Sequence, residues 1–237
     1  ASHYALGLFG YFRMSAICWW LCGNSPWLSH CVWSAKRSFV TNPNPACLAN
    51  INSGDNIMYG FLAMALRQSN ITRWPTMRCA QKETVLEHSA IVSILAMLIG
   101  QYAKENGDEI NEGLLMYHAL MHDAQEIICG DTITPTKRAN PTINAEFKKI
   151  EAAATHQMVK SAPPFMQDFL AKAFEPGGRE QTLVKACDTY AAYIKCRLEV
   201  AAGNKVEFGD ALERMEESVH LMIESIPELG RIHADFS

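Results

Sequence analysis

Two side chains that commonly bind metal ions stand next to each other at His122-Asp123, in a segment that is otherwise rich in apolar residues. Another histidine, His88, interrupts an apolar helical pattern upstream, and an aspartate, Asp188, interrupts one downstream. A polar group buried without a partner is costly, and a charged group more so. A shared cation is the simplest partner for all four, so the sequence predicts a metal site built from two imidazoles and two carboxylates.

Each of these residues also has an ordinary structural explanation. A lone histidine on an apolar helix face is often a hydrogen-bonded core residue, and Asp188 could be a buried carboxylate that accepts hydrogen bonds. The order His, His-Asp, Asp over three separate helical segments is much more specific than any one of its parts. Mixed nitrogen and oxygen ligands suit one divalent cation, and they leave Co, Mn, Zn, Fe and Mg open.

A glutamate one turn beyond His122 could handle protons at such a site. His118, His122 and Glu126 are spaced i, i+4 and i+8, so on one continuous helix they would lie on nearly the same face, with Asp123 about 100° further round. Glu126 would then accept a proton, directly or through a water molecule. An ordinary exposed glutamate remains the alternative, and His118 is expected in the core or beside the ligands.

The elements that would position these residues are helices. From residue 58 onward, apolar residues recur with helical spacing and no convincing strand pattern occurs. Thr84 and Glu87 form a capping box, Asn111 can cap another helix, and Gly130 is well placed to end it. We expect an all-α bundle of roughly six or more helices. The helices are expected at residues 58–68, 85–102, 112–129, 142–160, 180–202 and 209–225.

Prolines mark the expected breaks between these helices. Pro135 and Pro141 argue against helix in the segment 130–137, which we expect to be a loop. The pair Pro163-Pro164 is expected to stop the helix before it, and 209–225 is expected to be the last helix.

The composition bounds the class of protein. A chain of 237 residues with 49% hydrophobic and 19% charged residues can form one large domain or two small ones with a real core. The net charge of -4 gives no sign of a general nucleic-acid binder, although a small phosphorylated substrate remains possible. No run of 18 apolar residues occurs, so no membrane-spanning helix is expected. The cysteines at 79, 129, 187 and 196 lack metal-type spacing and look like reduced thiols of a cytoplasmic protein.

Residues 1–57 differ from the rest of the chain, because four of the five tryptophans but only four charged residues lie there. A secretory signal is disfavoured, since the apolar stretch at 14–22 is short and contains two tryptophans. A zinc module of Cys18, Cys22, His30 and Cys31 matches no standard ligand spacing. We therefore expect residues 1–57 to be a poorly structured extension, followed by one domain at 58–237.

The whole pattern resembles the HD-domain metallophosphohydrolases, and residues from about 58 to 237 are similar to the bacterial 5′-deoxynucleotidases of that superfamily. The motifs follow the family's order and approximate spacing. The blocks that carry the resemblance are Arg73-Trp74-Pro75, Glu87-His88-Ser89, His122-Asp123-Ala124-Gln125-Glu126, Gly130-Asp131, Thr134-Pro135-Thr136-Lys137 and Lys185-Ala186-Cys187-Asp188.

The resemblance implies a role for each of these side chains. One divalent cation would be held by His88, His122, Asp123 and Asp188. The substrate would contact three of these ligands, His88, Asp123 and Asp188, together with Arg73, Trp74, Asp131, Thr134 and Lys137. Arg73 would clamp the phosphate, and Trp74 would orient it and wall the sugar, which bears on the choice of 2′-deoxyribose. Glu126 and Asp131 would act around the attacking water, so that Glu126, Asp131 and Arg73 form the catalytic set.

The expected reaction is hydrolysis of a 2′-deoxynucleoside 5′-monophosphate to deoxynucleoside and phosphate. The resemblance also implies a homodimer that acts on small molecules, with neither a nucleic-acid polymer nor a membrane as partner. The alternatives are an HD hydrolase that releases triphosphate from deoxynucleoside triphosphates, and a non-catalytic nucleotide-binding regulator that kept the fold.

Overall fold

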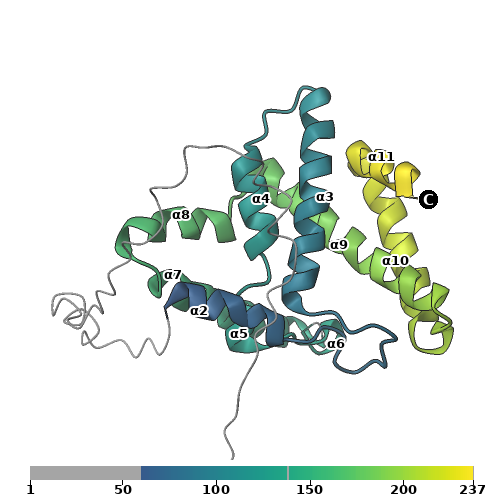
Figure 1. Cartoon of the computed structure of the whole chain (residues 1–237), viewed down its shortest axis with the longest axis horizontal. Helices are drawn as coiled ribbons and strands as arrows, with labels where there is room; N and C mark the ends of the chain where they lie inside the picture. Colours follow the sequence, from purple (N-terminus) through teal and green to yellow (C-terminus); the bar gives the residue numbers. More distant parts are fainter. Residues whose placement is uncertain (1–59, 138, 237) are drawn as a thin grey trace, which may run out of the picture. The chain divides into compact units, whose positions relative to one another are not determined.

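The computed structural model describes residues 60–137 and 139–236 of the chain. The hypotheses for residues 1–57, and with them the proposed boundary at residue 58, lie outside these described residues. Within the described part, every regular element is a helix, and a single antiparallel bridge joins Thr72 to Thr84 (Figure 1). The prediction of an all-α fold is confirmed.

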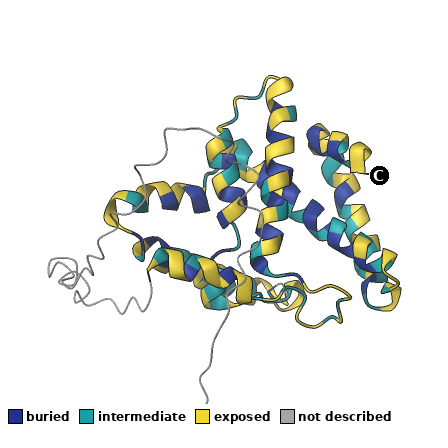
Figure 2. Ribbon diagram, viewed as in Figure 1, coloured by how far each residue is buried: buried dark blue, intermediate teal, exposed yellow. Residues whose placement is uncertain are grey.

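Three helices form the centre of the bundle: α3 (Val85–Glu105), α4 (Glu112–Met121) and α9 (Gly178–Ala201). They pack against one another, and α10 (Lys205–Ser225) and α11 (Pro227–Phe236) cover them on one side (Figure 1). Their buried faces meet in one apolar cluster, visible as the dark blue positions of Figure 2, which includes Val92, Ile99, Leu115, Leu183 and Tyr190. This core holds the three segments that carry the predicted metal ligands in a fixed relation.

A second group of helices lies below and to the left of the first in the view of Figure 1. It consists of α2 (Phe61–Ala65), a 3-10 turn (Leu66–Asn70), α5 (Glu126–Cys129), α6 (Thr134–Lys137), α7 (Pro141–Lys160) and α8 (Pro164–Phe174). A smaller apolar cluster joins them to the end of α4, through residues such as Met121, Met158 and Leu170. The segment around His122 therefore lies between two packed cores.

Helix α3 begins as the sequence predicts. Thr84 accepts a hydrogen bond from the backbone N–H of Glu87, and the Glu87 carboxylate accepts one from the backbone N–H of Thr84. The two bonds satisfy N–H groups that the first turn of a helix leaves without partners. A Cβ atom at Gly100 would lie 2.7 Å from the Leu115 side chain, so a larger residue there would require the buried Leu115 side chain to shift.

Helix α3 is also long and apolar enough to cross a membrane by length and composition, although it contains no unbroken run of 18 apolar residues. In the fold, 44% of its most apolar 18-residue window is buried. Its buried face belongs to the central core and packs against α4 and α9, whereas Ile94, Met97 and Leu98 on the same helix are exposed.

Several expected boundaries are wrong. The helix predicted at 112–129 is interrupted by turns at 122–125, and the loop predicted at 130–137 contains the short helix α6. Pro164 begins α8 instead of only stopping the helix before it, and Pro227 begins α11 beyond the expected last helix, which itself starts at Lys205. Proline suits the first turn of a helix because its missing N–H has no helical partner there.

Candidate metal centre

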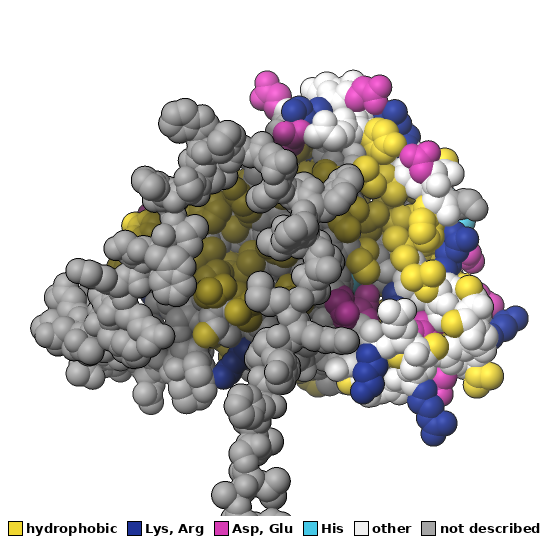
Figure 3. All heavy atoms as spheres, in the orientation of Figure 1, with side chains coloured by type: hydrophobic (Ala, Val, Ile, Leu, Met, Phe, Trp, Pro, Cys, Tyr) yellow, Lys and Arg dark blue, Asp and Glu magenta, His cyan; other side chains and the backbone are white. Residues whose placement is uncertain are grey.

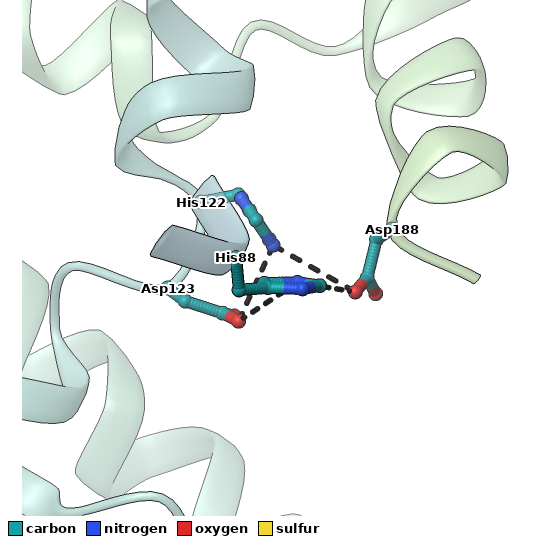
Figure 4. A group of neighbouring side chains, drawn as sticks. All are labelled: His88, His122, Asp123 and Asp188. Carbon is teal, nitrogen blue, oxygen red and sulfur yellow. Dashed lines mark hydrogen bonds and ion pairs between the residues drawn. The ribbon is translucent and has the colours of Figure 1, made fainter. Parts of the chain in front are cut away.

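The four predicted metal ligands come together from three parts of the chain (Figure 4). His88 lies in the first turns of α3, His122 and Asp123 lie at the turn that ends α4, and Asp188 lies in the middle of α9. One ligand atom from each side chain lies within 4.8 Å of all the others.

The individual distances suit a single shared cation. His88 Nε2 is 3.0 Å from Asp188 Oδ1, and His122 Nε2 is 3.3 Å from Asp123 Oδ2. The two cross-distances, His88 Nε2 to Asp123 Oδ2 and His122 Nε2 to Asp188 Oδ1, are both 3.8 Å. Metal–nitrogen bonds of about 2.1 Å allow ligands of one ion to be up to ~4.2 Å apart, so these four pairs fit one coordination sphere.

The cluster attracts positive charge. Burial opposes a charge on His122, but Asp123 and Asp188 outweigh it and raise the pKa of His122 well above its usual value. Burial also opposes the charge on Asp123, yet neighbouring His122 and Arg73 lower the pKa of its carboxyl to about 2. The pKa of Asp188 is lowered too, because the neighbouring imidazoles of His122 and His88 outweigh its burial. Two ionised carboxylates in a buried site therefore call for a cationic partner.

The orientation of His122 fits metal binding. Its Nδ1 is 2.8 Å from the carbonyl oxygen of Ala119, which can only accept, so Nδ1 carries a proton and donates it. The Nε2 atom then faces the carboxylates, is buried, and makes no hydrogen bond within the described residues. A backbone carbonyl that fixes the ring in this way is the usual support of a metal-binding histidine. A bound cation would take the place of the Nε2 proton.

Arg73 lies directly beside the ligands. Its Nη1 donates a hydrogen bond of 2.8 Å to Asp123 Oδ2. It lies in the connection 71–84 between the 3-10 turn and α3, where its backbone N–H donates to the carbonyl of Glu83 at 2.9 Å. The next residue, Trp74, has a φ of 60°, and its ring centroid is 5.4 Å from that of Phe208 on α10.

The predicted acid–base residue Glu126 is buried near the same cluster, at 4% exposure. Burial, followed by the charges of Asp123 and Asp131, raises the pKa of Glu126 to about 8. Its Oε2 atom is buried and has no hydrogen-bond partner within the described residues. Because α4 ends at Met121, Glu126 begins the separate helix α5 and does not share a helix face with His118 and His122 as expected.

The remaining predicted residues differ in their placement. The Nζ atom of Lys137 is 3.8 Å from Glu126 Oε1 and 2.9 Å from Glu151 Oε1. Thr134 is exposed in α6, and no interaction in the described part of the chain links it to the four ligands. His118 lies in the core and its Nδ1 donates to the carbonyl of Ala173 at 3.0 Å, in agreement with one of its two expected settings.

Sequence reasoning missed three residues that support the site. Glu83 contacts both Arg73 and Trp74, Glu151 pairs with Lys137, and Phe208 lies against the Trp74 ring. The position of Glu83 directly before the helix cap at Thr84 gives no signal of such contacts, since they depend on how the connection folds back.

Known proteins share this fold. An HD-domain phosphohydrolase from Listeria innocua matches with a TM-score of 0.64 at 21% identity, over 72% of this chain and 82% of that one. The HD phosphohydrolase DatZ of cyanophage S-2L, solved with dA and one catalytic Zn²⁺ ion, matches with a TM-score of 0.53 at 24% identity, over 73% of this chain and 94% of that one. At these identities the likeness concerns the fold.

Comparison by sequence is more specific about the family than comparison by fold. The 5′-deoxynucleotidase YfbR proteins of Salmonella paratyphi B and Salmonella enteritidis are 36% identical to this chain over 165 residues, which is 68% of this chain and 82% of each relative. The family model described as 5′-deoxynucleotidase YfbR-like matches residues 60–231, a range that includes every predicted site residue. The chain therefore belongs to the YfbR-like 5′-deoxynucleotidase family of phosphohydrolases.

Proposed function

We propose that the protein hydrolyses 2′-deoxynucleoside 5′-monophosphates to deoxynucleoside and inorganic phosphate, at the site formed by His88, His122, Asp123, Asp188 and Arg73. The observation that carries the proposal is the 2.8 Å hydrogen bond that places the Arg73 guanidinium against the ligand cluster. A phosphate ester has three oxygens that carry negative charge, and a guanidinium fork beside a cation site suits such a group.

The two histidines and two aspartates would hold one divalent cation, and Co, Mn, Zn, Fe and Mg are the candidates. When bound, such an ion supplies Lewis-acid stabilisation of the phosphoryl oxygens and a nucleophilic water at neutral pH. Support for a divalent ion comes from the unbonded His122 Nε2 and from the zinc ion named for the cyanophage phosphohydrolase.

Arg73 and Trp74 would recognise opposite ends of the substrate's sugar phosphate. Arg73 is tied to Asp123 through Nη1, so its position is fixed before the phosphate arrives and little ordering remains to be done. The ring of Trp74, packed against Phe208, would form the wall beside C2′ of the sugar. A wall at that position leaves no room for a ribose hydroxyl group.

Glu126 would act as the proton acceptor for the attacking water, at its unbonded Oε2 atom, once a divalent cation held by the neighbouring ligands lowers the pKa of its carboxyl and keeps it ionised. Asp131 contributes negative charge that raises the Glu126 pKa, and Lys137 opposes this effect from 3.8 Å away. In this proposal Asp131 orients the water, Lys137 adds positive charge near the substrate, and Thr134 contacts the substrate when it binds.

Product analysis tests the reaction. The full chain is incubated with dAMP, AMP and dATP side by side, each with Co, Mn, Zn, Fe or Mg, and the phosphorus products are identified. We expect inorganic phosphate from dAMP and much less from AMP. Release of triphosphate from dATP with no cleavage of dAMP would establish the other HD reaction, and nucleotide binding without any product would establish a regulator.

The Trp74→Ala variant tests the sugar assignment. We expect the ratio of dAMP to AMP hydrolysis to fall, because the wall beside C2′ is removed. An unchanged ratio would exclude Trp74 from sugar selection while leaving the reaction itself intact.

We also propose that the protein works in the cytoplasm as a homodimer. Apolar side chains gather on the surface of α3 and α4 (Figure 3), among them the exposed Met97, Leu98 and Tyr117. The described cysteines are free thiols, which suits a reducing compartment. Light scattering of the purified chain would give its mass, and a monomer at micromolar concentration would contradict the dimer.

A further inference from the structure

The carboxylate of Glu83 contacts both residues of the Arg73–Trp74 pair. Its Oε2 atom accepts a hydrogen bond of 3.1 Å from the Trp74 indole Nε1 and lies 3.5 Å from Nε of Arg73. The backbone carbonyl of Glu83 accepts the Arg73 N–H at 2.9 Å. One residue thus touches the backbone and side chain of Arg73 as well as the side chain of Trp74.

These contacts are made in a protected environment. The Glu83 side chain is 8% exposed and that of Arg73 is 14% exposed, so their attraction is only partly screened by water. The Arg73 guanidinium is bracketed between two carboxylates, with Asp123 at Nη1 and Glu83 at Nε. Removing either carboxylate would leave the positive charge of Arg73 less well compensated, and the guanidinium would be free to rotate.

The Trp74 ring needs this support because its backbone does not provide it. A φ of 60° lies in the left-handed region, which bulky side chains rarely adopt, so contacts elsewhere must maintain the conformation. Within the described residues, the Trp74 carbonyl accepts a hydrogen bond of 3.0 Å from the Met77 N–H, and its side chain is held by the Glu83 hydrogen bond at the indole edge and by the Phe208 ring, 5.4 Å away and tilted by 59°. Phe208 is fully buried on α10 and cannot move aside.

We propose that Glu83 is the residue that couples phosphate binding to sugar selection, by fixing the Arg73 guanidinium and the Trp74 indole through one shared oxygen atom. The inference rests on the proposed roles of Arg73 and Trp74. Glu83 is a positioning residue, because it acts on the substrate through these two side chains. Because Oε2 contacts both side chains, the distance between the Arg73 guanidinium and the Trp74 ring is fixed. A nucleotide whose phosphate binds Arg73 therefore meets the Trp74 ring at a set distance.

Two substitutions separate the two contacts. In Glu83→Gln, the amide oxygen still accepts from Trp74 Nε1, but the charge that faces Arg73 is lost. In Glu83→Ala, both contacts are lost. We expect Glu83→Gln to raise KM for dAMP with the ratio of dAMP to AMP hydrolysis nearly unchanged. Glu83→Ala should raise KM and also lower that ratio by about tenfold. Loss of such a supporting contact typically costs about 10- to 100-fold in kcat/KM.

Controls distinguish positioning from general loss of structure. The exposed Glu109 receives the same Glu→Gln substitution and should retain wild-type kinetics. Thermal unfolding and metal content are measured for every variant, and we expect the Glu83 variants to retain bound metal because the four ligands are untouched. If both Glu83 variants keep wild-type KM and the wild-type sugar ratio, the proposal is overturned.

A ¹⁹F NMR measurement that requires no substrate turnover keeps the test independent of the proposed function. The full chain is labelled with 5-fluorotryptophan, and the ¹⁹F resonance of Trp74 is assigned by its loss in Trp74→Phe. We expect this resonance to shift and broaden in Glu83→Ala, and to stay in place in Glu109→Gln. An unmoved resonance in Glu83→Ala would overturn the positioning role. If the wild type cleaves no nucleotide, the proposed function fails and the resonance still decides whether Glu83 holds Trp74.

Discussion

Arg73 donates a hydrogen bond of 2.8 Å from Nη1 to Oδ2 of Asp123, so the proposed phosphate clamp is attached to a proposed metal ligand. Because of this contact, the guanidinium is held beside the cation site by a side chain that cannot move without disturbing the ligand cluster. In the proposed site, phosphate and metal recognition would therefore depend on one shared carboxylate.

The first prediction concerns the shape of the Arg73 side chain. Arg73→Lys keeps the charge but cannot contact Asp123, Glu83 and a phosphate at the same time. We expect a loss of about 10²- to 10³-fold in kcat/KM, with metal content unchanged. Steady-state kinetics and elemental analysis of the variant check this, and kinetics equal to the wild type would contradict the clamp.

Two histidines one helical turn apart provide a matched pair of variants. His122→Gln should lose stoichiometric metal and phosphate release, because Nε2 is one of the four proposed ligand atoms. His118→Gln removes a buried histidine that contacts the Ala173 carbonyl, and it should keep its metal. Metal loss in both variants would indicate that the fold, and not the ligand, had been damaged.

The third prediction separates proton handling from metal binding. Glu126→Gln preserves size and burial but cannot take a proton at Oε2. We expect full metal occupancy with kcat lower by about 10²- to 10⁴-fold. Turnover close to that of the wild type would remove Glu126 from the mechanism and leave only a structural role.

The fourth prediction concerns stability in acid. Burial opposes the charge of Glu199, but hydrogen bonds from Lys195, Asn204 and the backbone N–H groups of Ala80 and Gln81 outweigh it and lower its pKa to about 2. An unfolded glutamate has a pKa of about 4.3. The stabilisation is therefore complete above pH ~4.3 and is lost as the pH falls toward about 2.

Replacing Glu199 by glutamine should thus lower the free energy of unfolding by about 2 kcal/mol at neutral pH, and the difference from the wild type should shrink below about pH 4. Denaturant unfolding at pH 7 and pH 3.5 measures this. Glu146→Gln is the matched control, since Glu146 also pairs with a lysine but is 59% exposed and should contribute little. A pH-independent difference would contradict the ionised network.

The helices and the ligand set can be predicted from the sequence for different physical reasons. The capping box at Thr84 depends only on residues three apart, and the start of α3 follows it. The break after Met121 has no such local signal, because apolar spacing continues through it. The prolines at 141, 164 and 227 each begin a helix, and a proline by itself does not tell a stop from a start.

At the site, the types and order of His88, His122, Asp123 and Asp188 point to one cation, and the structure brings these side chains together. The contacts of Glu83 and Glu151 could not be predicted in this way. They arise where connections fold across helices, and neither residue has a spacing that ties it to Arg73 or Lys137.

The left-handed backbone of Trp74 has a consequence for engineering. Glycine or asparagine would relax that backbone, which holds a bulky residue at a cost of about 1–3 kcal/mol. Variants chosen only for heat tolerance would therefore tend to drift toward small residues at position 74 and lose the sugar selection that we propose for Trp74. Screens that aim at a more robust enzyme should score ribonucleotide cleavage alongside melting temperature.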